Sequence, residues 1–169
     1  MPTILAVLAG AILGAVAWRV RGGWLGGAVG WGVGSARLVA WALPMGALAA
    51  LVSWGSPWWL GPAVGALAFA TSTLPTFGAL DAGRNEGSIL GDAARNLGRG
   101  LLTVAPLAAL LWWCGYATWW VMLLAGAWMA PAYEIAWRWL LPADRPETAA
   151  ECLFGAAFGA ALVGAIALG

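Results

Sequence analysis

The sequence predicts an all-α, polytopic transmembrane helical bundle, and two observations lead to this fold class. Only 9 % of the 169 residues are charged and 63 % are hydrophobic, whereas a soluble domain is about 25 % charged. The few charged residues also lie mainly between long apolar stretches. Since so apolar a chain cannot hide its surface in one small core, we expect lipid to surround it. Residues 1–169 are expected to form a single transmembrane domain.

Six apolar stretches have the length of membrane spans. The shorter ones would measure about 24–27 Å as helices, slightly less than a hydrocarbon core of about 30 Å. Local thinning of the bilayer or snorkelling of flanking side chains can absorb that difference. The predicted spans are residues 3–18, 38–54, 57–75, 100–116, 117–139 and 149–168.

The first span has a signal peptide as its alternative. Its sequence, "MPTILAVLAGAILGAVAW", has no basic residue before the apolar stretch, and Arg19 and Arg21 follow it. A secretory signal has the opposite order, so we expect a retained helix.

The segment after it, residues 24–36, is apolar but only 13 residues long, which suits a re-entrant or interfacial segment. The alternative is a span that continues to about residue 43 with Arg37 inside the membrane. That alternative would change the number of spans, and the Arg residues would then no longer all lie on one face of the bundle.

The basic residues predict the orientation. All eight are Arg. Seven fall in the connections after the first, third and fifth spans, and Arg138 lies at the end of the fifth span, so all eight share one face of a six-span bundle. The positive-inside rule makes this face cytoplasmic, so the N- and C-termini face outward. The acidic residues lie on the same face or at its margin: Asp81, Glu86, Asp92, Glu134, Asp144, Glu147 and Glu151.

The two outer connections carry no charge and are rich in Trp. They read "GSPWW" and "WWCGYATWW", and seven of the fourteen Trp residues lie in or beside them. An aromatic belt at a membrane interface has this composition. In this topology Cys114 is outside and Cys152 inside, so these two thiols cannot pair with each other.

An internal repeat relates two predicted hairpins, although chance is the alternative in so biased a composition. In each hairpin an Arg is followed seven residues later by Pro, then by Gly and by two adjacent Trp residues. A parallel repeat of this kind implies a pseudo-two-fold axis along the membrane normal. The two copies are Arg37, Pro44, Gly55, Trp58 and Trp59, and Arg99, Pro106, Gly115, Trp119 and Trp120.

Small residues recur four positions apart, for example Gly10 with Gly14 and Gly155 with Gly159. This spacing lets helix backbones approach closely in lipid. We expect tight helix packing within or between subunits, although 25 Gly residues also produce such pairs by chance.

The polar stretch "DAGRNEGSILGDAARNLGRG", residues 81–100, has two interpretations. In the first, residues 76–99 form a cytoplasmic loop whose Arg side chains fix the orientation. In the second, they form a polar site at the cytoplasmic mouth of the bundle. A short helix from about residue 88 would align Asp92, Arg95 and Arg99 on one face. Planar Arg groups suit anions or lipid phosphates.

A second polar cluster follows Pro131. Glu134 and Arg138 are one helical turn apart and can pair. Pro131 is expected to kink the fifth span and to turn this segment along the interface. If the helix instead continues into the membrane, Glu134 becomes an intramembrane carboxylate of the kind that marks functional sites. Together the two clusters predict contacts with a solute, an ion or an anionic lipid at Arg84, Asn85, Glu86, Asp92, Arg95, Arg99, Glu134 and Arg138.

The composition excludes several classes of chemistry. Without Lys there can be no Schiff base with retinal or pyridoxal. Without His there is no imidazole ligand or general base. Two Cys residues are too few for a cluster or a thiolate zinc site, and a net charge of +1 gives no electrostatic case for nucleic acid. We therefore predict no catalytic residues, no metal site, no cofactor and no enzymatic activity.

The run "LDAGRNEGSILGDAARNLGRG", with "PAYEIAWRW" downstream, resembles small polytopic membrane proteins encoded by phages and prophages. The resemblance covers about residues 79–140. It implies a membrane protein and no particular activity.

Two functions agree with these patterns. The first is a channel or transporter-like conduit for a small solute or ion, with the Arg residues at its cytoplasmic entrance. The second is a structural or accessory membrane protein whose charges only orient it and bind partners. A chain this small suggests a homo-oligomer or a subunit of a larger membrane complex. Basic residues that are all Arg, with abundant Ala and Gly, are typical of GC-rich bacterial or phage genomes, so we expect a bacterial inner membrane.

Overall fold

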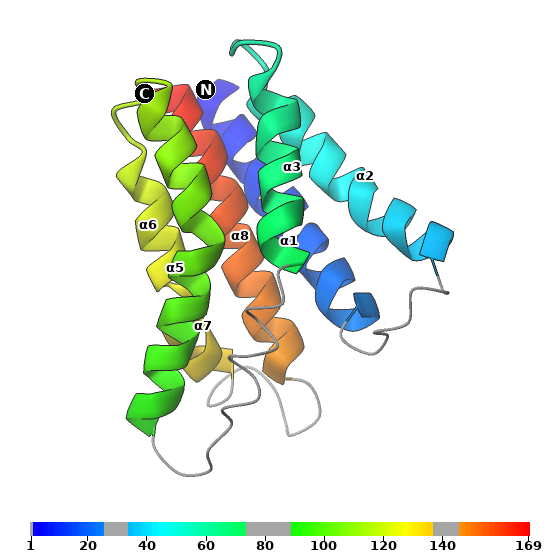
Figure 1. Ribbon diagram of the computed structural model, residues 1–169, viewed down its shortest axis with the longest axis vertical. Helices are drawn as coiled ribbons and strands as arrows, with labels where there is room; N and C mark the ends of the chain where they lie inside the picture. The colour runs from blue at the N-terminus through cyan, green and yellow to red at the C-terminus, as the bar shows by residue number, and fades with distance from the viewer. Residues whose placement is uncertain (1, 26–33, 74–88, 137–145) are drawn as a thin grey trace.

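The computed structural model describes residues 2–25, 34–73, 89–136 and 146–169, and within these ranges all regular structure is helical (Figure 1). The all-α prediction is therefore confirmed, and these ranges contain no strand. The helices are α1 (Pro2–Leu25), α2 (Gly34–Val52), α3 (Leu60–Thr73), α5 (Ile89–Trp113), α6 (Trp120–Ala127), α7 (Met129–Ile135) and α8 (Pro146–Leu168).

The helices run alternately up and down one bundle. Both chain termini and the two turns at residues 53–59 and 114–119 lie at the same end, which we call the terminal end (Figure 1). The start of α5, α7 and the start of α8 lie at the opposite end, which we call the arginine end. The helices follow the order of the apolar stretches in the sequence, but the six predicted membrane spans are not confirmed, because only two of the described helices have the length and hydropathy of a span.

Helices α1 and α8 pack in antiparallel direction with their backbones in contact. Gly10 faces Gly159, and Gly14 faces Gly155. A Cβ atom added to Gly10 would lie 2.7 Å from the carbonyl oxygen of Gly159 and 2.6 Å from Cγ2 of Val163. Because no side chain separates the helices at these positions, small residues four apart on both helices permit the approach. The small-residue pairs predicted from the sequence thus pack within one chain.

An aromatic cluster extends this interface toward the arginine end. Trp18 of α1 is buried against Phe154 and Phe158 of α8. Its ring centroid lies 5.1 Å from that of Phe154, at an interplanar angle of 72°, and 4.6 Å from that of Phe158. Edge-to-face arrangements of this kind add to the stabilisation that burial provides.

The rest of the core lies among α2, α3, α5, α6 and α8. Gly61 of α3 lies against the backbone of Ala49 in α2, and Gly100 of α5 lies against Gly126 of α6. In the part of the chain that the structure describes, Thr103 is the only buried polar side chain. The largest buried apolar side chains of these helices include Leu48, Leu60, Val64, Leu107, Leu111, Met122 and Leu162.

Helix α5 begins where a short helix was predicted and continues further than expected. The sequence analysis predicted a polar segment over residues 76–99 with a short helix from about residue 88, followed by a span from residue 100, whereas residues 89–113 form one continuous helix. The helix therefore joins the polar segment to the predicted span without a break. Glycine disfavours a helix by about 1 kcal/mol per residue, which was the reason to expect a break. Packing offsets this cost at Gly100, where a Cβ atom would overlap the Gly126 carbonyl oxygen of α6 and would lie 2.8 Å from the Met129 Cβ of α7.

The predicted fifth span is divided into α6 and α7, with Trp128 between them. The chain continues through the break, because Trp128 N–H donates to the Leu124 carbonyl at 2.9 Å and Ala132 N–H donates to the Trp128 carbonyl at 2.9 Å. A proline ring clashes with the carbonyl four residues before it. For Pro131 that carbonyl belongs to Ala127, the last residue of α6, so Pro131 explains why the helix is interrupted there.

The ends of α1, α2 and α3 also differ from the predicted ends of the apolar spans. Residues 24–25 end α1 and residues 34–36 begin α2, while the intervening part of the predicted re-entrant segment lies outside the described residues. Helix α3 has 14 residues, which corresponds to about 21 Å.

Two of the described helices are long and apolar enough to cross a membrane. These are residues 2–19 of α1, with a mean hydropathy of 1.6, and residues 149–168 of α8, with a mean hydropathy of 1.9. Residues 42–52 form a shorter apolar segment within α2.

The two hairpins that carry the sequence repeat share their turn geometry. Pro44 lies inside α2 and Pro106 inside α5. Each hairpin turn contains a glycine with positive φ, +80° at Gly55 and +85° at Gly115. After α5, Tyr116 N–H donates to the Leu111 carbonyl at 3.0 Å and Gly115 N–H donates to the Trp112 carbonyl at 3.0 Å. This pair of bonds is a Schellman motif, which favours glycine at its left-handed position.

Candidate functional site

The charged residues on the described helices gather toward the arginine end (Figure 1). Arg19 lies in the second half of α1, and Glu151 lies near the start of α8. The contact of Gly14 with Gly155 sets the register of these antiparallel helices, so Arg19 and Glu151 lie at a similar level. The remaining charges with described side chains are Asp92, Arg95, Arg99 and Glu134.

Asp92 and Arg95 pair with each other on the first turns of α5. Nη1 of Arg95 lies 3.2 Å from Oδ1 of Asp92. The Arg95 side chain is 18 % exposed and that of Asp92 is 56 % exposed. Asp92 also lies in the first turn of its helix, where a negative charge interacts favourably with the helix dipole. Both residues therefore have a local structural role in starting α5.

Arg99 lies one turn further along α5, next to the contact between α5 and α6. Its Nε atom is buried. Its backbone carbonyl accepts a hydrogen bond of 2.9 Å from the buried Thr103 hydroxyl. The next residue, Gly100, lies directly against Gly126. The sequence analysis did not single out Thr103, because one Thr in an apolar stretch gives no signal.

Glu134 lies on α7, which packs against both α5 and α8. It is partly buried, and the preceding Tyr133 packs against the hydrophobic core. The structure thus brings the helix of Glu134 beside the helix of Arg95 and Arg99. The predicted partner of Glu134, Arg138, lies outside the described residues, as do Arg84, Asn85 and Glu86.

Of the predicted contact residues, the structure thus describes Asp92, Arg95 and Arg99 on α5 and Glu134 on the neighbouring α7. Among the described residues no group of three or more His, Cys, Asp or Glu side chains could hold a metal ion. The two cysteines are free thiols at opposite ends of the bundle, Cys114 after α5 and Cys152 in the first turns of α8.

At the terminal end, the described residues expose Trp side chains instead of charged ones. Trp54, Trp58 and Trp113 are 83 %, 84 % and 79 % exposed. Two hydrogen bonds join different segments at this end. The Tyr116 hydroxyl donates to the Ser56 hydroxyl at 3.3 Å, and the Thr118 hydroxyl donates to the Ala165 carbonyl at 2.7 Å. These bonds join the two hairpin turns to each other and to the end of α8.

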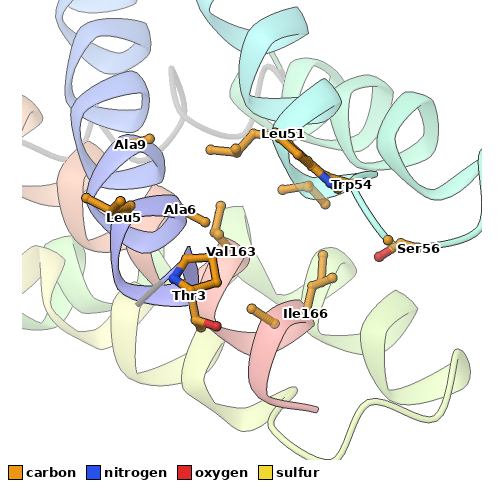
Figure 2. A pocket seen from close by; sticks show the side chains of 13 residues that line it. Thr3, Leu5, Ala6, Ala9, Leu51, Trp54, Ser56, Val163 and Ile166 are labelled. Carbon is orange, nitrogen blue, oxygen red and sulfur yellow. The ribbon is translucent and has the colours of Figure 1, made fainter.

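A groove opens at the terminal end between α1, α2 and α8, with a volume of about 630 Å³ (Figure 2). Apolar side chains from all three helices line it, and Thr3, Trp54 and Ser56 also contribute to its wall. The sequence analysis missed this groove, because Ala6 and Ala9 look like any other Ala in an apolar helix. The apolar lining residues labelled in the figure are Leu5, Ala6, Ala9, Leu51, Val163 and Ile166.

Comparisons with known proteins found no match for this chain among family models, curated proteins or solved structures. The residues and their geometry therefore carry the functional argument.

Proposed function

We propose that this chain is a polytopic integral membrane protein of the structural or accessory type, with six membrane-crossing segments and both termini outside. One observation supports it most: charges and exposed Trp residues lie at opposite ends of a bundle whose helices alternate in direction. Among the described side chains, the exposed Trp residues lie at the terminal end, and the charged residues lie toward the arginine end of the helices that carry them. A bilayer selects this pattern through the positive-inside rule and the aromatic belt.

The exposed surface of α1 supports the same placement. A core helix of a soluble protein is mostly buried, but only 22 % of residues 2–19 are buried. Ile4, Leu8 and Ile12 lie one turn apart and are 65 %, 55 % and 65 % exposed. Such a continuous apolar stripe suits contact with lipid rather than with water.

The length and composition of two helices fit a bilayer. Helices α1 and α8 have 24 and 23 residues, or roughly 34–36 Å each, which exceeds a hydrocarbon core of about 30 Å. Helix α5 has 25 residues, but Asp92, Arg95 and Arg99 lie in its first turns, so only its second part is apolar. Helices α6 and α7 together cross with a break, and α2 and α3 form a shorter hairpin. Short segments in a bundle are accommodated by local thinning of the bilayer.

The packing of the bundle favours the structural or accessory role over the conduit. The described core contains apolar side chains and backbone contacts between glycines, with Thr103 as its buried polar residue. Asp92 and Arg95 pair locally. A water-filled path needs polar lining groups, so a conduit would have to form between copies of the chain. We propose a homo-oligomer, or a subunit of a larger complex, in a bacterial inner membrane.

The experiment that tests the topology uses single cysteines in a background in which Cys114 and Cys152 are replaced by Ser. Ala117→Cys places a thiol in the outer turn, and Ala94→Cys places one near the start of α5; both alanines are exposed. A membrane-impermeant maleimide should label Ala117→Cys in intact spheroplasts and should label Ala94→Cys only after lysis. The reverse pattern would overturn the orientation, and recovery of the protein in the soluble fraction would overturn membrane insertion.

A flux assay separates the two functional roles. Purified protein in liposomes should give no more release of entrapped chloride or glycerol than empty liposomes. Release that depends on the protein, and that changes with Arg99→Ala while the fold stays intact, would favour the conduit instead.

A further inference from the structure

The groove at the terminal end has a graded polarity. Its walls along α1 and α8 are apolar, with Leu5, Ala6 and Ala9 on one side and Val163 and Ile166 on the other (Figure 2). Thr3 lies in the first turn of α1, and Trp54 and Ser56 lie in the turn after α2, so all three are at the terminal end of the bundle. The groove therefore has polar groups at one end and an apolar interior at the other.

The position of the groove matches this polarity to a bilayer. Exposed Trp side chains mark the level of the lipid headgroups, and Trp54, which contributes to the groove, is 83 % exposed. The lining residues of α1 run from Pro2 to Ala9, a rise of about 10 Å along the helix. A single leaflet of hydrocarbon is about 15 Å thick, so the groove covers the upper part of the outer leaflet.

The size of the groove distinguishes its possible occupants. A volume of about 630 Å³ lies within the usual range of small-molecule sites, roughly 300–1,000 Å³. A 10 Å length of α-helix about 10 Å in diameter occupies roughly 800 Å³. A helix from a second copy would therefore fit only in part, whereas a flexible hydrocarbon chain can follow the walls.

We propose that this groove binds one acyl chain of a glycerophospholipid from the outer leaflet, with the ester region of the lipid beside the Thr3 and Ser56 hydroxyls. This inference rests on the proposed placement of the chain in a bilayer. The small side chains of Ala6 and Ala9 leave the space that the acyl chain fills, and Leu51 and Ile166 contact it from α2 and α8. The bound lipid fills the space between the packed pair of α1 and α8 and the end of α2.

Native mass spectrometry of the full chain in dodecyl maltoside tests the proposal, with palmitoyl-oleoyl phosphatidylglycerol as the added probe. The wild-type protein should retain one lipid under activation that removes the others. Ala6→Phe and Ala9→Phe should each weaken retention by about tenfold, since exclusion of two methylene groups already has that effect. Ala109→Phe, at an exposed position of α5, is the matched control and should retain the lipid as the wild type does.

Equal retention by the groove variants and the control would overturn the proposal. So would a change in subunit number in Ala9→Phe without a change in lipid retention, since a second copy would then occupy the groove. A photoreactive phospholipid with a diazirine on its acyl chain provides a measurement on the unaltered protein. It should label residues 2–9, 51–56 and 163–167 preferentially, and uniform labelling over the exposed face of α1 would contradict the site.

The experiments distinguish a failure of the acyl-chain proposal from a failure of the proposed membrane placement. If the maleimide experiment gives the expected orientation and lipid retention is unaffected by the groove variants, only the proposal that the groove binds an acyl chain is refuted. If the protein is water-soluble, the membrane placement itself is wrong.

Discussion

Gly14→Ala is expected to destabilise the protein, because the added methyl group meets backbone atoms of α8. A Cβ atom at Gly14 would overlap the carbonyl oxygen of Gly155 and would lie 2.9 Å from the backbone nitrogen of Gly159. Backbone atoms cannot rotate away as a side chain can. The cost should therefore be near the upper end of the range for overpacking, about 3 kcal/mol. Replacing Gly by Ala in a helix returns at most about 1 kcal/mol, so the net loss in unfolding free energy is about 2 kcal/mol.

Thermal unfolding in detergent, followed by circular dichroism, measures this loss. For a chain of 150–250 residues, each kcal/mol changes Tm by roughly 2–4 °C, so Gly14→Ala should lower Tm by roughly 4–8 °C. Gly46→Ala is the matched control, because Gly46 lies in a helix and a Cβ there would meet nothing within 4 Å. The control should raise Tm slightly or leave it unchanged. If both variants behave alike, the close contact of α1 with α8 does not exist in the folded protein.

The same unfolding assay checks three further variants. Trp18→Ala removes the ring that packs on Phe154 and Phe158 and should cost about 3–5 kcal/mol; a loss below about 1 kcal/mol would contradict its burial. Thr118→Val removes the 2.7 Å hydrogen bond to the Ala165 carbonyl and should cost about 1 kcal/mol, so an unchanged Tm would argue against that bond. Asp92→Asn breaks the ion pair with Arg95, but Asp92 is 56 % exposed, so the change should stay below about 1 kcal/mol; a larger effect would mean that the pair is shielded from water.

Helix class and order could be predicted from the sequence because apolar runs and charge positions report on them directly. The short helix from about residue 88 was predicted as well, but its continuation into the following span was not. Glycines in and before the first turns of α5 argue for a break when only local propensity is considered. In the structure one helix runs from Ile89 to Trp113, and Gly100 permits close packing against Gly126 where the break was expected. Tertiary packing thus outweighed local propensity there.

The candidate site was predictable to a smaller extent. The alignment of Asp92 and Arg95 follows from helical spacing, and the structure pairs these side chains. The groove involves three helices that are distant in sequence, residues 2–9, 51–56 and 163–167. Its existence depends on how the fold places these three segments beside one another, and no local pattern encodes that placement.

The contrast between the two ends of α1 gives a further reason to place the bundle in lipid. Toward the arginine end, Trp18 is buried in an aromatic cluster and Arg19 follows it. Toward the terminal end, Ile4, Leu8 and Ile12 are exposed and the groove opens beside them. In water an exposed apolar stripe next to an apolar groove would promote aggregation. In a bilayer the same surface is solvated by acyl chains, and the groove becomes the place where one of those chains is held between helices. The proposed membrane placement thus explains both the exposed stripe and the unfilled volume, while a soluble fold would need a separate partner to cover each.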